Sequence, residues 1–272
     1  MNYFIGVDVG TTSTKAVLYD EHTNVIKRFS QSYPLFRHPN GMAEQDPTTI
    51  VNAVEKVIGD AAQQINFFKE RLLAVAFSSA NQSLILLDQA FRPQSRLITW
   101  ADTRARHAAN QLKRSALGRQ LYVNTGTPIH PMSPLTKLLW LKEADPELLS
   151  QAAYIGDIKS YLFCRFFGTF KVDISIASCT GMMNINSGDW DPTALNLVGI
   201  RQEQLPEIVN GTYQATGLLP KAQARMGIPA DTPFIYGAFD GALSNLGVGA
   251  LKPDTVAITI GTSAAVRVIT DH

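Results

Sequence analysis

The feature that most constrains the fold is a short β-hairpin at the start of the chain that recurs near its end. Residues 3–19 contain two runs rich in β-forming residues, and the Gly10–Thr14 segment between them is typical of a tight turn. Residues 256–269 repeat this pattern around Gly261 and Thr262. The two hairpins align over their glycine-threonine turns, which indicates a weak internal repeat.

Between the hairpins, short β-rich runs alternate with helical patterns. A third strand is predicted over residues 25–33, so the chain should open with three antiparallel strands. Asp46 followed by Pro47 is typical of a helix start, and apolar residues continue at helical spacing to Ile65. Further strands are predicted at residues 72–77, 84–87 and 234–238, and further helices at residues 102–117, 133–140 and 241–249. This mixture predicts a layered α/β domain.

The composition excludes several classes of protein. The 24 basic and 23 acidic side chains of the 272 residues leave a net charge of +1 without blocks of like charge, so no nucleic-acid partner is expected. Apolar runs such as Leu72–Phe77 are far shorter than the roughly 20 residues that span a bilayer. Cys164 and Cys179 show no CxxC or metal-ligand spacing, and the start lacks an export signal. We therefore expect a cytoplasmic protein without a membrane partner.

The first hairpin carries residue types that suit a phosphate clamp. Asp8 ends one strand and could hold Mg²⁺, and Gly10 lets backbone N–H groups approach a phosphate closely. Thr11, Thr12 and Lys15 add further donors. An ordinary polar turn has the same composition, and this alternative stays open. The chain has no GxxxxGK[ST] loop and no GxGxxG after a strand, so a P-loop or Rossmann site is not expected.

Asp240 is the candidate catalytic base. It lies where a buried strand gives way to a helix of small residues. From such a crevice position, a carboxylate could accept a proton from a substrate hydroxyl group. Aspartate is also among the best helix N-cap residues, so a purely structural role is the alternative.

A second group of residues suits a polyol. Trp100 offers a flat apolar face, while Asp102 and Arg104 could hold hydroxyl groups or an anionic group of a substrate. The alternative is a buried Trp100 before an N-capping Asp102, with Arg104 solvated on the first helical turn. Asn81 and Gln82 offer amide donors and acceptors on a predicted loop, which alone is uninformative.

These motifs occur in the order seen in the FGGY carbohydrate kinases, and the chain resembles that family over residues 3–272. The resemblance rests on Asp8 to Lys15, Trp100 to Arg104, Lys137 to Trp140, Gly237 to Gly241 and Gly261 to Ser263. It implies an α/β, actin-like ATPase (ribonuclease H-like) fold, with a mixed sheet flanked by helices and two domains that close over a cleft. Within the family, the motifs are most similar to those of members that phosphorylate gluconate, as seen in residues 10–15, 98–102, 125–131 and 240–247.

The resemblance also implies a role for each candidate residue. Asp8 would hold Mg²⁺, and Asp240 would be the catalytic base. Phosphate contacts would come from Gly10, Thr11, Thr12 and Lys15, and from Gly261 and Thr262 in the second hairpin. The sugar site would be lined by Asn81, Gln82, Trp100, Asp102 and Arg104.

The same resemblance implies domains and a reaction. Residues 1–250 would form the N-terminal domain with the sugar site and the base, and residues 251–272 would be the first hairpin of an incomplete, ATP-binding C-terminal domain. With ATP and Mg²⁺ as cofactors, the expected reaction converts D-gluconate to 6-phosphogluconate. We expect the chain to be the first half of a longer protein and, alone, to bind ATP poorly and to be inactive.

Several alternatives stay open. Asn81 and Gln82 depart from the Met-His pair common at this point in the family's xylulose kinases, which leaves xylulose, another pentulose or a polyol as alternative substrates. A non-catalytic sugar-binding fragment is an alternative of another class. An actin-like filament or chaperone ATPase would share the clamp, but it gives no reason for Trp100, Asp102 and Arg104. The oligomeric state is open, a homodimer included.

Overall fold

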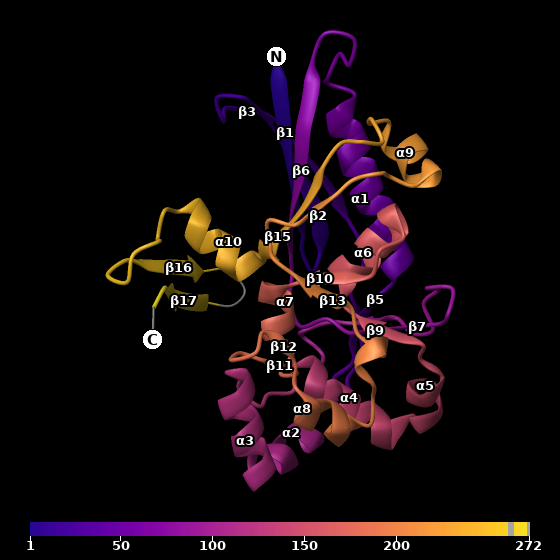
Figure 1. The fold of residues 1–272 in the computed structure, drawn as a ribbon, viewed down its shortest axis with the longest axis vertical. Coiled ribbons are helices and arrows are strands. Elements are labelled where there is room, and N and C mark those ends of the chain that lie inside the picture. The colour runs from indigo at the N-terminus through magenta and orange to yellow at the C-terminus, as the bar shows by residue number, and fades with distance from the viewer. Residues whose placement is uncertain (261–263, 271–272) are drawn as a thin grey trace.

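A mixed β-sheet forms the centre of the fold (Figure 1). The computed structural model describes residues 1–260 and 264–270, and within them the main sheet has six strands in the order β14-β15-β6-β1-β2-β3. Strands β1, β6 and β15 are parallel to one another, whereas β2, β3 and β14 run antiparallel to their neighbours. The strands are β1 (Asn2–Val9), β2 (Ser13–Asp20), β3 (Val25–Ser32), β6 (Arg71–Ser79), β14 (Gln214–Ala215) and β15 (Phe234–Phe239).

The first hairpin forms because its apolar residues alternate. Every second residue of β1 from Tyr3 to Val9 is buried in the core, while the residues between them lie on the other face. The pairing of β1 with β2 places Asp8 opposite Lys15, and the N–H of Gly10 closes the turn by donating to the carbonyl of Ser13 at 3.0 Å. The prediction of three antiparallel opening strands is confirmed.

Helices cover one face of this sheet, as Figure 1 shows for α1, α6 and α9. The Asp46 carboxylate caps α1 by accepting the N–H of Thr48 at 2.8 Å, as predicted. Ile50, Val54 and Val57 of α1 are buried in the core of the sheet. The helices are α1 (Pro47–Ala62), α6 (Ile158–Phe167) and α9 (Pro220–Met226). Helix α10 (Asp240–Gly247) and the hairpin of β16 (Val256–Ile260) and β17 (Ala264–Val268) lie on the opposite side.

A second apolar core lies beyond the carboxyl ends of β1 and β6, in the lower part of Figure 1. Its helices are α2 (Arg106–Lys113), α3 (Ala116–Thr125), α4 (Pro134–Ala144), α5 (Pro146–Gln151), α7 (Ile174–Ser178) and α8 (Pro192–Val198). The structure also has short strands outside the main sheet: β4 (Phe36–Arg37), β5 (Ala43–Gln45), β7 (Ile85–Leu87), β8 (Leu97–Ile98), β9 (Tyr154–Gly156), β10 (Lys171–Asp173), β11 (Met183–Asn184), β12 (Asp189–Trp190) and β13 (Glu207–Val209). In the part of the chain that the structure describes, no helix has the length and apolar character needed to cross a membrane.

The predicted helix over residues 102–117 is wrong, because the structure has α2 and α3 there with a break between them. The Asp102 carboxylate accepts the N–H of Arg104, which holds this segment in a turn until α2 begins. The predicted helix is interrupted at Ser115, because its hydroxyl group accepts the N–H of Gly118 at 2.9 Å and so caps a new helix, α3. The helix predicted at residues 133–140 continues to Ala144.

Strand β15 changes direction just before Asp240. Gly237 has φ +63°, and the pairing of β15 with β6 shifts register between Ile235 and Ala238. A Cβ atom at Gly237 would lie 1.9 Å from the carbonyl oxygen of Phe77. Only glycine therefore fits this position, because any side chain would overlap with the backbone of β6.

Gly237→Ala should lower the free energy of unfolding by about 3 kcal/mol, because it combines an unfavourable φ with a backbone overlap. Gly217→Ala is the matched control, since Gly217 has φ +83° and a Cβ atom there would meet nothing within 4 Å, and we expect a loss of about 1 kcal/mol there. Denaturant unfolding of both variants measures the difference. Equal losses in the two variants would contradict the account of the bend.

Candidate functional site

The carboxyl ends of three parallel strands bring the two candidate carboxylates to one edge of the sheet. Asp8 of β1 is in register with Ser78 of β6, and Ser78 is in register with Ala238 of β15, two residues before Asp240. The hydroxyl group of Ser78 donates to Oδ1 of Asp8 at 2.9 Å. Asp8 and Asp240, 232 positions apart in the sequence, therefore face a common site.

The electrostatics of Asp240 agree with this placement. Partial desolvation by the surrounding protein raises the pKa of Asp240 above its ordinary value, and the negative charge of Asp8 acts in the same direction. The N–H of Gly241 and the charges of Arg267 and Lys159 act against the shift. Asp240 is the first residue of α10, and the N-cap position belongs to Phe239, so the purely N-capping alternative does not fit. A carboxyl group with a raised pKa suits a general base.

The turn after β1 offers backbone donors beside Asp8. A Cβ atom at Gly10 would lie 3.1 Å from the carbonyl oxygen of Ser13, so the turn is already close-packed. The hydroxyl group of Tyr33 donates to the carbonyl of Gly10 at 2.6 Å and holds the turn in place. The hydrogen bonds found among residues 1–260 and 264–270 include none from the N–H groups of Thr11 or Thr12. Both groups are therefore available to a phosphate oxygen.

Trp100 joins the candidate sugar site to this turn. Its indole Nε1 donates to the hydroxyl group of Thr11 at 2.8 Å, and the Gln45 amide donates to the Thr11 carbonyl at 2.7 Å. Gly10, Thr11, Asn81 and Trp100 line one small hollow. Trp100 is 36% exposed, which argues against the alternative of a buried tryptophan. An aromatic face and polar groups therefore lie side by side here, a combination that suits a polyol.

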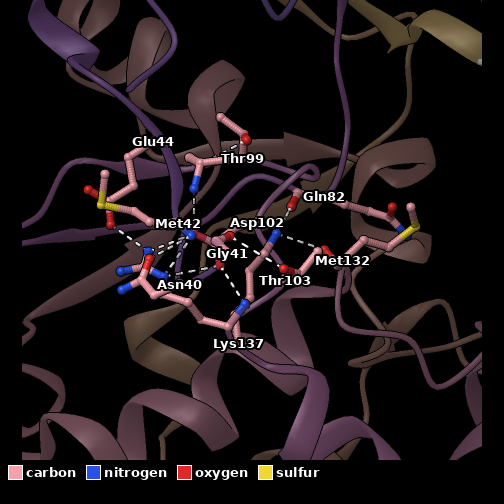
Figure 2. Close-up of polar contacts among 12 residues, drawn as sticks. Asn40, Gly41, Met42, Glu44, Gln82, Thr99, Asp102, Thr103, Met132 and Lys137 are labelled. Carbon is pink, nitrogen blue, oxygen red and sulfur yellow. Dashed lines mark hydrogen bonds and ion pairs between the residues drawn. The ribbon is translucent and has the colours of Figure 1, made fainter. Parts of the chain in front are cut away.

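Asp102, which Figure 2 labels, is buried and bonded to Arg104. Asp102 is 1% exposed, and its carboxylate accepts the N–H of Ala43 at 3.0 Å and Nε of Arg104 at 2.9 Å. Arg104 also forms an ion pair with Glu44 and stacks 4.3 Å from the ring centre of Trp140. Arg104 is therefore largely shielded from solvent instead of free on the helix surface, and it links β5 to α4. A direct contact of Asp102 or Arg104 with a substrate stays a prediction.

A buried lysine supports the loop with Asn81 and Gln82. Nζ of Lys137 donates to the carbonyl oxygens of Gln82 at 2.5 Å and of Met132 at 2.7 Å, as Figure 2 shows. Gln82 has φ +58°, a strained conformation for a residue with a side chain. Burial lowers the pKa of Lys137 to about 7; Asp102 opposes this shift, and Arg104 adds to it. A neutral amine still has two N–H bonds for the two carbonyl groups.

Lys137→Met tests whether the lowered pKa of Lys137 makes the stability of the protein depend on pH. A folded-state pKa of about 7 lies below the unfolded value of about 10.4, so between them the unfolded chain binds more protons than the folded chain. The free energy of unfolding of the wild type should therefore rise from about pH 7 to pH 9, by about 1 kcal/mol per pH unit from this group. Lys137→Met should lack that contribution.

The matched control is Lys142→Met in the same helix. Lys142 is exposed, and its Nζ donates to the carbonyl of Leu197 at 2.9 Å. Urea unfolding at several pH values should give the wild-type pH dependence for this variant. If Lys137→Met kept the wild-type dependence as well, the buried amine would not be its source.

Sequence reasoning missed the residues that hold the end of β15. Lys159 of α6 and Asp173 of β10 form a fully buried ion pair next to this strand end. The one available signal was Asp157, which precedes an apolar run and caps α6 through the N–H groups of Lys159 and Ser160. The predicted contacts of Gly261 and Thr262 lie outside the described residues.

The oxygen atoms at the sheet edge fit a magnesium ion bound together with a nucleotide. Among the described residues, no group of three or more His, Cys, Asp and Glu side chains could hold a metal ion. Mg²⁺ needs no such cage, because it keeps several waters and is usually held by one or two carboxylates plus substrate phosphates. Asp8, with its Ser78 partner, supplies one such carboxylate.

Comparisons with known proteins point to one family. Residues 3–247 match the model of the N-terminal domain of the FGGY family of carbohydrate kinases. The gluconokinase of Bacillus subtilis (strain 168) is 43% identical over 271 residues, which are 99% of this chain and 52% of that protein. The chain thus spans about half the length of the curated relatives it matches.

Solved structures of carbohydrate kinases are also similar to this chain. A ligand-bound xylulose kinase from Lactobacillus acidophilus matches with a TM-score of 0.96 at 39% identity, covering 100% of this chain and 55% of that one. A gluconate kinase from the same species matches with a TM-score of 0.95, also at 39% identity, covering 99% and 54%. These matches confirm the mixed α/β architecture expected for an actin-like ATPase fold.

Proposed function

Because the chain belongs to the FGGY family of carbohydrate kinases, we propose that the protein transfers a phosphoryl group from ATP to a hydroxyl group of a sugar or sugar acid. The observation that carries this proposal is the common edge shared by Asp8 and Asp240. A kinase needs a phosphate site and a base on either side of the reacting hydroxyl group. The turn with Thr11 and Thr12 lies beside Asp8 and supports the first requirement.

Each residue at the edge has a role in this proposal. Asp240 accepts the proton of the substrate hydroxyl group as its oxygen attacks the γ-phosphorus, and the products are the sugar phosphate and ADP. The N–H groups of Thr11 and Thr12, with Lys15, hold phosphate oxygens. Asp8 orients Mg²⁺, which when bound neutralises charge on the phosphates.

The sugar lies against Trp100 in this proposal. The exposed indole packs against C–H groups, and Asn81 beside it offers an amide to the hydroxyl groups. Gln82, Asp102 and Arg104 complete the proposed sugar site, with Asp102 and Arg104 also fixing its wall from behind. Residues 1–250 would carry this sugar site and the base, and residues 251–272 would begin an ATP-binding domain in which Gly261 and Thr262 contact phosphate.

D-gluconate is the substrate that the relatives favour. The gluconokinase of Bacillus subtilis is 43% identical to this chain, and the reaction would convert D-gluconate to 6-phosphogluconate. Xylulose is the second candidate, because the xylulose kinase structure from Lactobacillus acidophilus is as similar to the chain as the gluconate kinase structure. The two substrates differ in charge, so an activity assay separates them.

A coupled ADP-release assay of the full-length protein with a panel of sugars and sugar acids tests the substrate. We expect a higher kcat/KM with gluconate than with xylulose, other pentuloses or polyols. A preference for xylulose would replace the first candidate by the second. ADP release that no carbohydrate stimulates would contradict the kinase proposal itself.

Asp240→Asn should lower kcat of the full-length protein by roughly 10³-fold, because it removes the base and leaves the backbone in place. Sugar binding, measured by calorimetry, should persist, since Asp240 acts on the proton in transit. Asp231→Asn is the matched control: Asp231 is exposed and precedes β15, so the activity should stay at the wild-type level. Near wild-type turnover in Asp240→Asn would show that another group is the base.

A further inference from the structure

Lys159 is fully buried and reaches the backbone next to Asp240. Its Nζ donates to the carbonyl oxygens of Tyr236 at 3.0 Å and of Ala238 at 3.1 Å. It also forms an ion pair with Asp173 at 2.7 Å, in which both side chains are 0% exposed. These contacts account for the three N–H bonds of an ammonium group. Lys159 lies on α6, on the other side of β15 from α10 (Figure 1).

Asp173 extends this network to the residue before Asp240. Its Oδ1 accepts the N–H of Ser175 at 3.1 Å and the Ser175 hydroxyl group. The oxygen of that hydroxyl group in turn accepts the N–H of Phe239 at 2.9 Å. The network therefore holds the carbonyl groups of Tyr236 and Ala238 and the N–H group of Phe239, all in the last residues of β15 before Asp240.

The bend in β15 explains why such a network is needed. Gly237 turns the chain at φ +63°, and the regular pairing of β15 with β6 is interrupted there. Backbone groups freed from the sheet must find other partners when they are buried. Lys159 and Ser175 supply these partners at Tyr236, Ala238 and Phe239.

We infer that Lys159, Asp173 and Ser175 are positioning residues that fix the bent end of β15, so that the carboxylate of Asp240 faces Asp8 and the substrate hydroxyl group. This inference rests on the proposed function of Asp240 as the base. Lys159 stays out of contact with the substrate, because its ammonium group is fully buried and bonded to Asp173 and the backbone.

Stability alone does not explain this choice of residues. Removing two charges from water is costly, and a well-packed apolar pair at such a position is often as stable as the ion pair or more so. An apolar pair could not bond to the carbonyl groups of Tyr236 and Ala238 or to Ser175. The buried pair thus gives the strand end one defined geometry, which a reacting carboxylate requires.

The positive charge of Lys159 also affects the pKa of Asp240. Lys159 is one of the groups that favour the ionised form of Asp240, together with Arg267 of β17 and the N–H of Gly241. Asp8 of β1 opposes them, and the thiol of Cys179 also lies within electrostatic range of Asp240. Loss of the Lys159 charge should therefore raise the pKa of Asp240 and move the acid limb of the pH–activity profile to higher pH.

Lys159→Met in the full-length protein is the direct test. We expect kcat with gluconate, or with the best substrate of the panel, to fall by about 10²-fold while KM stays within a fewfold of wild type. The acid limb of kcat should move to higher pH. A merely structural role would lower the unfolding temperature without moving this limb. Lys56→Met is the control, because Lys56 forms a solvent-exposed ion pair with Asp60 at the same distance of 2.7 Å.

Ser175→Ala keeps the inference testable if Lys159→Met does not fold. It removes the hydroxyl group that bonds to Phe239 without changing any charge. We expect kcat to fall by about tenfold, with KM and the acid limb unchanged. Wild-type kcat in Ser175→Ala would overturn the inference, and so would a folded Lys159→Met variant with the wild-type kcat and acid limb. If either result were found while Asp240→Asn is inactive, the positioning inference would be wrong and Asp240 would still be the proposed base. If Asp240→Asn were active, the proposed role of Asp240 as the base would itself be wrong.

Discussion

The parallel pairing of β1, β6 and β15 is the constraint on which the site depends. Parallel strands end at the same edge of a sheet, and ligands in open α/β sheets bind at that edge. Here the pairing carries Asp8, Ser78 and Asp240 to one place, although they come from distant parts of the chain. The Gly10–Thr12 turn follows directly from β1, and Trp100 is bonded to it through Thr11. The candidate residues for phosphate, metal and sugar binding thus lie at or next to this edge of the sheet.

Buried polar groups then refine what the sheet positions. Lys137 bonds to the strained loop at Gln82, and Lys159 bonds to the end of β15. The pair of Asp102 and Arg104 bonds to β5 through Ala43 and Glu44. Such groups are costly to bury and contribute little net stability. Each of them, however, satisfies the hydrogen bonds of its polar neighbours in one geometry only. The apolar cores thus determine the fold, and the buried polar groups fix the backbone beside the candidate site.

The sequence allowed good prediction of local structure, whereas the roles of the candidate site residues stay predictions. Alternating apolar residues predicted the opening hairpin, and Asp46 with Pro47 predicted α1. The helix over residues 102–117 was wrong, because the Asp102 carboxylate keeps the start of the segment in a turn and Ser115 caps a new helix, and helix propensity registers neither bond. Lys159 and Asp173 could not be predicted, since a buried ion pair between α6 and β10 depends on tertiary packing. The order of the motifs supplied the family resemblance, and the resemblance supplied the expected fold.

The central claim is that Asp8 and Asp240 share one site, and a titration of the Asp240 carboxyl group by NMR tests it most directly. The negative charge of Asp8 contributes to the raised pKa of Asp240. In Asp8→Asn, the pKa of Asp240 should therefore be lower than in the wild-type protein. The same pKa in both proteins, with the fold intact, would place the two carboxylates too far apart to act on one substrate.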